Sequence, residues 1–195
     1  MRALKVVRYT AVVLTVLVVA LAGRAMLFQP VAVPTPGGSF TLVDGHGRVV
    51  TDRDFRGQWM LVYFGYTYCP DVCPTGLQTI SQALGLLSPD KAGRIRPLFI
   101  TVDPQRDTPG VMQAYTRAFH PDMVGLTGTE QQIADVAAAY RVYYRKAPDS
   151  GRSQDDYLVD HSALAFLMGP DGHYVTWFAH GLSAEDMAGG LDRLL

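Results

Sequence analysis

Apolar runs and segments of helical periodicity alternate along most of the chain. The continuous apolar run at Met60–Phe64 is typical of a buried strand, the mostly apolar segment Ile95–Val102 predicts the next strand, and a shorter run follows at Met123–Leu126. Segments with helix-start signals or with helical spacing of apolar residues lie between and after these strands. The predicted helices cover residues 73–87, 108–119 and 129–144, and a last helix begins at Ser183.

Two hairpins enclose this alternating region. The first turns at Asp44–Gly47 and the second at Gly169–Gly172, and short apolar strands flank each turn. Strands joined through helices pair in parallel, whereas hairpins add antiparallel strands. The pattern therefore predicts an α/β fold in which helices cover both faces of a mixed sheet that includes an N-terminal hairpin.

The beginning of the chain has a different pattern. A basic tip covers residues 1–8, an apolar stretch broken by Arg24 covers residues 9–28, and a Pro/Gly-rich segment covers residues 29–38. The apolar stretch has about the length of a membrane-spanning helix. We expect a single transmembrane anchor with a cytoplasmic N-terminus, then a linker, then a domain over residues 39–195.

A cleaved signal peptide is the alternative for this segment, because Ala20–Ala22 resembles a cleavage site. Both hypotheses place the domain outside the cytoplasm. With the anchor retained, it would face the periplasm from the inner (cytoplasmic) membrane, in a compartment where thiols can oxidise.

Composition narrows the range of functions. The chain has 195 residues, 48% of them apolar, which is enough for one globular domain besides the N-terminal segment. Its net charge of −1 gives no sign of a nucleic-acid partner. The chain contains two cysteines, too few for a disulfide scaffold, so they are better interpreted as reactive or metal-binding groups.

Cys69 and Cys73 follow the predicted strand Met60–Phe64. A strand that leads into a cysteine pair and then a helix is typical of thioredoxin-like redox proteins, so we predict a thioredoxin-like sheet. The start of a helix lowers the pKa of a thiol, which makes thiolates available near neutral pH. With three residues between them, the cysteines can close a redox-active disulfide or hold one soft metal ion.

Copper(I) suits two sulfur ligands, whereas a structural zinc site prefers four protein ligands. A third donor would come from one of the five histidines. His161 precedes a strand predicted at Leu164–Met168, and in thioredoxin-like folds this loop faces the cysteines. Its neighbour Asp160 is a candidate to orient the imidazole. The other histidines are weaker candidates, in hairpin turns or beside helices: His46, His120, His173 and His180.

A second polar cluster follows the strand Ile95–Val102, at the sheet edge where functional loops gather. Ion pairs among Asp103, Arg106 and Asp107 could rigidify this loop beside the cysteines. The simpler interpretation is a proline-stiffened turn that starts a helix. Two tyrosines just before the first cysteine, Tyr66 and Tyr68, are candidates to wall the metal and slow its oxidation.

Three segments together resemble the Sco/SenC family of copper-binding proteins, membrane-tethered thioredoxin-fold domains involved in building cytochrome c oxidase. The segments are Gly65–Pro74, Val102–Pro109 and Val159–Ser162, and the resemblance extends from Phe40 to the C-terminus. The resemblance implies that Cys69, Cys73 and His161 bind one copper ion, as Cu(I) or Cu(II).

The resemblance also implies a reaction and partners. The domain would act as a metallochaperone that delivers copper to the CuA centre in cytochrome c oxidase subunit II. Alternatively, Cys69 and Cys73 would form a thiol–disulfide reductase that reduces the cysteines of that centre. A periplasmic copper donor and a thiol reductant would act upstream. A peroxiredoxin-like peroxidase fits poorly, because the segment Cys69–Pro74 lacks the Pro/Thr/Arg setting of a peroxidatic cysteine.

Overall fold

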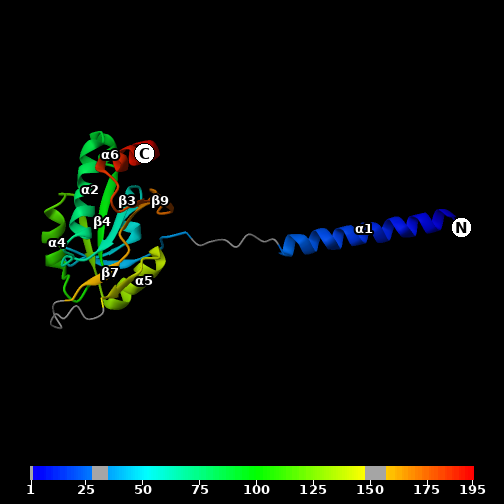
Figure 1. The fold of residues 1–195 in the computed structure, drawn as a ribbon, viewed down its shortest axis with the longest axis horizontal. Coiled ribbons are helices and arrows are strands. Elements are labelled where there is room, and N and C mark those ends of the chain that lie inside the picture. The colour runs from blue at the N-terminus through cyan, green and yellow to red at the C-terminus, as the bar shows by residue number, and fades with distance from the viewer. Residues whose placement is uncertain (1, 28–34, 148–156) are drawn as a thin grey trace. The chain divides into compact units, whose positions relative to one another are not determined.

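The computed structural model describes residues 2–27, 35–147 and 157–195. The chain divides into two compact units, Met1–Pro34 and Thr35–Leu195 (Figure 1). The hydrophobic core begins at Phe40, and so it belongs to the second unit.

The first unit contains helix α1 (Arg2–Leu27), whose residues from Val12 to Leu21 are exposed. A helix is thus confirmed over most of the expected anchor, while residues 28–34, including most of the expected linker, lie outside the described residues. The anchor itself is not confirmed. Within the described part of the chain, no helix combines the length and the apolarity that crossing a membrane requires.

The second unit is built on a seven-stranded sheet with the strand order β2-β1-β5-β4-β3-β8-β9. The strands are β1 (Thr41–Asp44), β2 (Val49–Thr51), β3 (Trp59–Gly65), β4 (Ile95–Thr101), β5 (Val124–Thr127), β8 (Leu164–Met168) and β9 (Tyr174–Ala179). β4 pairs in parallel with both β3 and β5, and the remaining pairs are antiparallel. The predicted mixed sheet with two hairpins is confirmed.

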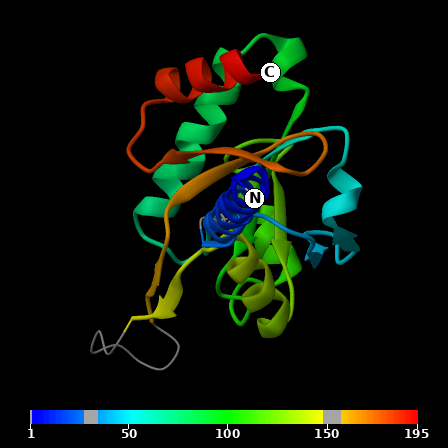
Figure 2. The same cartoon turned by 90° about the vertical axis from the view of Figure 1, so that its right-hand side faces the viewer.

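Helices cover both faces of this sheet. They are α2 (Val72–Leu86), α3 (Pro89–Ala92), α4 (Pro109–Arg117), α5 (Glu130–Tyr140) and α6 (Ala184–Leu194), and a short 3-10 helix, η1 (Asp52–Phe55), follows β2. Tyr63 packs against Gly76 of α2 on one face, whereas Phe64 contacts Tyr140 of α5 on the other. Helices α2 and α6 pack against each other (Figure 2).

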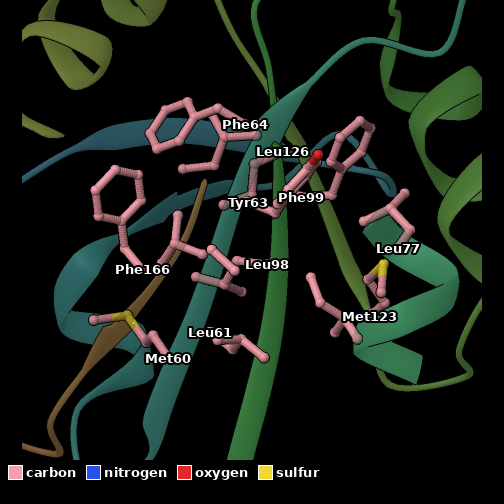
Figure 3. Packing of buried hydrophobic residues seen from close by; sticks show 14 of the residues in the cluster. Met60, Leu61, Tyr63, Phe64, Leu77, Leu98, Phe99, Met123, Leu126 and Phe166 are labelled. Atoms are coloured by element: carbon pink, nitrogen blue, oxygen red, sulfur yellow. The ribbon is translucent and has the colours of Figure 1, made fainter. Parts of the chain in front are cut away.

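The core is densest around β3 and β4, whose apolar residues are buried on both faces, as expected for central strands. Figure 3 shows Phe64 and Phe166 on one side of these strands and Leu77 and Met123 on the other. The aromatic rings of Phe64, Tyr140 and Phe166 pack together at centroid separations of 5.3 to 6.3 Å. The segment that contains the two cysteines follows directly after β3.

Two short strands were not expected from the sequence. β6 (Tyr144–Lys146) and β7 (Val159–His161) form a separate two-stranded antiparallel sheet. The helix predicted to reach about residue 144 ends at Tyr140, because Arg141 takes a left-handed conformation with φ of 58° that terminates it. At the other end of α5, the predicted cap is confirmed: Thr129 accepts a hydrogen bond from the backbone N–H of Gln132.

Candidate metal centre

The two cysteines lie where β3 passes into α2. Cys69 is in the connecting loop, and Cys73 is in the first turn of the helix, fully buried. Cys69 is 8% exposed and is the sulfur nearer to solvent. Gly65, the last residue of β3, permits this arrangement: a Cβ atom there would collide with the Cys73 sulfur and lie 2.8 Å from Cε2 of Phe99.

His161, the last residue of β7, brings an imidazole to the sulfurs. Its Nε2 lies 3.2 Å from Sγ of Cys73, and its Nδ1 lies 3.2 Å from the carbonyl oxygen of Ser162. For metal binding, a hydrogen on Nδ1, donated to that carbonyl, would leave the lone pair of Nε2 free for an ion held by the sulfurs. The ligand atoms of Cys69, Cys73 and His161 all lie within 4.8 Å of one another, close enough to share one metal ion.

The hydrogen bond between the two sulfurs dominates their electrostatics. It lowers the pKa of Cys69, and His161 and two backbone N–H groups lower it further, although burial acts in the opposite direction. The same hydrogen bond raises the pKa of Cys73, and burial and the charge on Cys69 add to that rise. The pair therefore holds a thiolate on Cys69 and a proton on Cys73. A metal ion bound to both sulfurs would displace that proton.

Of the two candidate tyrosines, Tyr66 is the one that walls the site. Its buried ring meets the imidazole of His161 edge-on, with the ring centres 5.7 Å apart. Its hydroxyl accepts a hydrogen bond from the backbone N–H of Val159 at 3.1 Å. The side chain of Tyr68 lies mostly in solvent, with the residue 61% exposed, and its ring stacks with the guanidinium of Arg106 at 4.6 Å.

The ion pair expected beside the cysteines is present between Asp103 and Arg106, with Nε and Oδ2 2.5 Å apart. Asp107 instead accepts hydrogen bonds from the side chains of Thr67 and Thr101 and from the backbone N–H of Thr67. Burial raises the pKa of Asp107 against the lowering effect of these hydrogen bonds. The loop is thus bonded directly to the segment that carries Cys69.

Asp160 does not take the position expected for it. Its carboxylate lies 3.8 Å from the guanidinium of Arg145 on the surface, and the carbonyl of Ser162 is the partner of His161 Nδ1. The sequence reasoning also missed Tyr157, whose hydroxyl donates to Oδ1 of Asp103 at 2.6 Å. Tyr157 precedes His161 by four residues, and the period of two along an extended segment would have placed both side chains on one face.

The other four histidines are not part of this cluster. Two of them have neighbours that account for their polar atoms: His46 contacts the side-chain amide of Gln113, and Nδ1 of His120 accepts the backbone N–H of Asp122. His173 and His180 are exposed near the ends of β9. Among the described residues, Cys69, Cys73 and His161 form the cluster of histidine, cysteine or acidic side chains whose ligand atoms lie close enough together to hold one metal ion.

The chain is similar to known proteins over this whole domain. It is 45% identical over 157 residues to the mitochondrial protein SCO2 homolog of Bos taurus, covering 80% of this chain and 58% of that protein. It is 43% identical over 155 residues to the protein sco1 of Schizosaccharomyces pombe, covering 80% and 59%. The chain therefore spans less than two thirds of the length of these relatives.

A solved structure extends the similarity to the fold. The structure of Bradyrhizobium japonicum ScoI with copper bound has a TM-score of 0.74 and 43% sequence identity, and the match covers 83% of this chain and 100% of that chain. A chain limited to this region therefore folds by itself, and we expect the same of Thr35–Leu195. The SCO1/SenC family model matches residues 30–195. The sequence motifs, the fold and these comparisons agree, and the chain belongs to the SCO1/SenC family.

Proposed function

We propose that the domain binds one copper ion through Cys69, Cys73 and His161. The observation that carries this proposal is the convergence of two sulfurs and one imidazole nitrogen within 4.8 Å, from two segments distant in the sequence. The donor set fits copper: thiolates favour Cu(I), and an imidazole suits Cu(II) as well. A structural zinc site would need a fourth protein ligand, and the cluster found in the described residues has three members.

The proposed role of the bound copper is transfer to another protein. Cys73 is buried beneath the site, whereas Cys69 lies nearer to solvent. A thiolate of an acceptor can therefore approach from the side of Cys69 and replace the ligands of the ion one at a time. From the family, we propose the CuA centre of cytochrome c oxidase subunit II as the acceptor, with an extracytoplasmic copper donor upstream.

A thiol–disulfide reductase is the second candidate, favoured by the lowered pKa of Cys69 beside a protonated Cys73. The Cys69 thiolate would attack a disulfide of the acceptor and form a mixed disulfide. Cys73 would then give up its proton and attack Cys69, which releases the acceptor as a dithiol and leaves a Cys69–Cys73 disulfide. Two electrons pass to the acceptor, and a thiol reductant must restore the pair.

We further propose that the N-terminal segment directs the domain out of the cytoplasm, as a retained anchor or as a cleaved leader. Basic residues at the start of α1 precede its apolar part, the charge order of exported proteins. Fractionation of cells that express the full chain tests this. The domain is expected outside the cytoplasm, in the membrane fraction if α1 is retained, and a cytoplasmic domain would contradict the proposal.

The two candidate reactions are separated by two mixing experiments, both without oxygen, with the metal-free CuA domain of oxidase subunit II. In one arm the Cu(I)-loaded domain meets an acceptor whose CuA cysteines are already reduced, and in the other the reduced, copper-free domain meets an acceptor whose CuA cysteines form a disulfide. A chaperone transfers copper to the reduced acceptor in a way that needs His161. A reductase converts the oxidised acceptor without copper and survives His161→Ala. Failure in both arms would exclude both roles toward this acceptor.

A further inference from the structure

His161 lies on a structural element that is weak by itself. β6 and β7 have three residues each, and among the described strands they pair only with one another. An isolated two-stranded ribbon is marginally stable in water. Cys69 and Cys73, by contrast, follow the central strand β3 and are buried in the core. The position of the imidazole relative to the sulfurs therefore depends on contacts between this hairpin and the rest of the domain.

Tyr157 supplies such contacts just before β7. Its hydroxyl donates to Oδ1 of Asp103 at 2.6 Å, and the guanidinium carbon of Arg106 lies 3.7 Å from the centre of its ring. Nε of Arg106 donates to Oδ2 of the same carboxylate at 2.5 Å. Each of the three side chains thus contacts the other two, and Asp103 and Arg106 are 3% and 13% exposed at their side chains. Burial strengthens these charge-assisted contacts.

The same guanidinium also reaches the segment that carries the cysteines. It lies 4.6 Å from the ring centre of Tyr68 and 5.7 Å from that of Tyr66, both within the range of a cation–π interaction. Tyr66 in turn holds the backbone of Val159 through its hydroxyl. Arg106 therefore contacts both ligand-bearing segments at once, the histidine segment through Tyr157 and the cysteine segment through Tyr68 and Tyr66.

We propose that Arg106 is a positioning residue for His161: stacked on Tyr157 and paired with Asp103, it fixes the β6–β7 hairpin against the cysteine loop. A planar guanidinium can donate in its plane to a carboxylate while its face stacks on a ring, and a lysine ammonium cannot do both. The inference rests on the proposed copper site for its functional consequence. Cu(II) gains more from the imidazole than Cu(I) does, so Cu(II) binding depends most on Arg106.

The test uses Arg106→Lys, which keeps the charge, and Tyr157→Phe, which keeps the ring. Arg56→Lys is the matched control, because Arg56 also pairs with a buried aspartate, Asp52, but at η1. The first measurement is amide hydrogen exchange of the metal-free protein at Val159 and Ser162, whose N–H groups bond to Tyr66 and to Tyr143. Exchange is expected about tenfold faster in both test variants, with no change in the control.

The second measurement is Cu(II) binding, followed by electron paramagnetic resonance and by the sulfur-to-copper absorption band. Arg106→Lys and Tyr157→Phe are expected to shift both signals and to weaken Cu(II) binding about tenfold, while Cu(I) affinity changes much less. Arg56→Lys is expected to give the wild-type spectra and both wild-type affinities.

Wild-type exchange rates and a wild-type Cu(II) spectrum in both test variants would overturn the proposal. Faster exchange spread evenly through α2 and β3 would also overturn it, because it would indicate general destabilisation. The exchange measurement needs no metal, so the copper site and the positioning role of Arg106 are tested separately. A wild-type protein that binds no copper would end the proposed function, whereas unchanged exchange at Val159 and Ser162 would end this inference alone.

Discussion

The sulfur of Cys73 lies 3.2 Å from Nε2 of His161, although 88 residues separate the two along the chain. Cys73 lies at the start of α2, directly after the inner strand β3, whereas His161 lies on a short hairpin outside the main sheet. Their meeting adds an imidazole nitrogen to the two sulfurs and completes a cluster of three possible metal ligands. The predictions below test what each part of this arrangement contributes.

Replacement of the imidazole should separate metal binding from thiol chemistry. In His161→Ala, Cu(II) affinity is expected to fall by more than about 100-fold, because even residues that only support a metal ligand contribute up to that much. Cu(I) binding should weaken but persist on the two sulfurs, and the Cys69–Cys73 disulfide should still form. Spectroscopic titration with each copper state and a thiol count measure these effects.

His180→Ala serves as the control for this variant, since His180 is exposed and is not part of the cluster of Cys69, Cys73 and His161. If His161→Ala bound both copper states like the wild type, the assignment of the third ligand would be wrong.

The close approach at Gly65 should be sensitive to a single methyl group. A Cβ atom there would meet the Cys73 sulfur and the ring of Phe99, both in the packed core, so Gly65→Ala is expected to destabilise the domain by about 1–3 kcal/mol. It should also displace the sulfur and weaken copper binding. Chemical denaturation and a copper titration measure the two effects.

Gly85→Ala is the matched control, because a Cβ atom at Gly85, within helix α2, would have no atom within 4 Å. This change is expected to be neutral or to stabilise by up to about 1 kcal/mol. Equal stability of Gly65→Ala and the wild type would contradict the tight packing described above.

A third prediction concerns pH and the first hairpin. Burial raises the pKa of Asp44, but hydrogen bonds from the Arg48 side chain and from the backbone N–H groups of Arg48 and His46 outweigh it and bring the pKa below its usual 3.8. A carboxyl group whose pKa is lower in the folded state stabilises the fold at pH values above the unfolded pKa. That contribution is lost as the pH falls through the folded pKa.

Asp44→Asn should therefore destabilise the domain at about pH 7 by about 1 kcal/mol, a modest value because the Arg48 side chain is largely exposed. The difference between variant and wild type should shrink as the pH is lowered toward about 2.5. Denaturation curves at both pH values measure it. A difference that stays constant with pH would mean that the charge of Asp44 contributes nothing.

The elements that the sequence predicted well are those with strong apolar patterns. β3 is a continuous apolar run and β4 is apolar apart from Arg96 and Thr101, and their place at the centre of the sheet follows from burial on both faces. The position of the cysteines after β3 follows from the same run. The ion pair between Asp103 and Arg106 could be anticipated because the two residues are three apart in one loop.

The hairpin that carries His161 had no comparable signal. β6 includes Arg145 and Lys146, and three-residue strands are too short to show an alternation. The expectation that Asp160 orients the imidazole of His161 was wrong because β7 was not foreseen. Neighbouring residues on a strand point to opposite faces, so the residue next to His161 faces away from the imidazole. Contacts such as that of Tyr66 with Val159 join residues 93 apart, and they depend on the tertiary fold.

The most direct test of the copper site is a Cu(I) titration of the reduced unit Thr35–Leu195, without oxygen, against a chromophoric chelator. Cys69→Ser, Cys73→Ser and His161→Ala are titrated in parallel. The account predicts one tightly bound equivalent for the wild type, lost in the two serine variants and weakened in His161→Ala. A wild-type domain that does not compete for copper, yet readily cycles a Cys69–Cys73 disulfide, would contradict it and favour the thiol reductase.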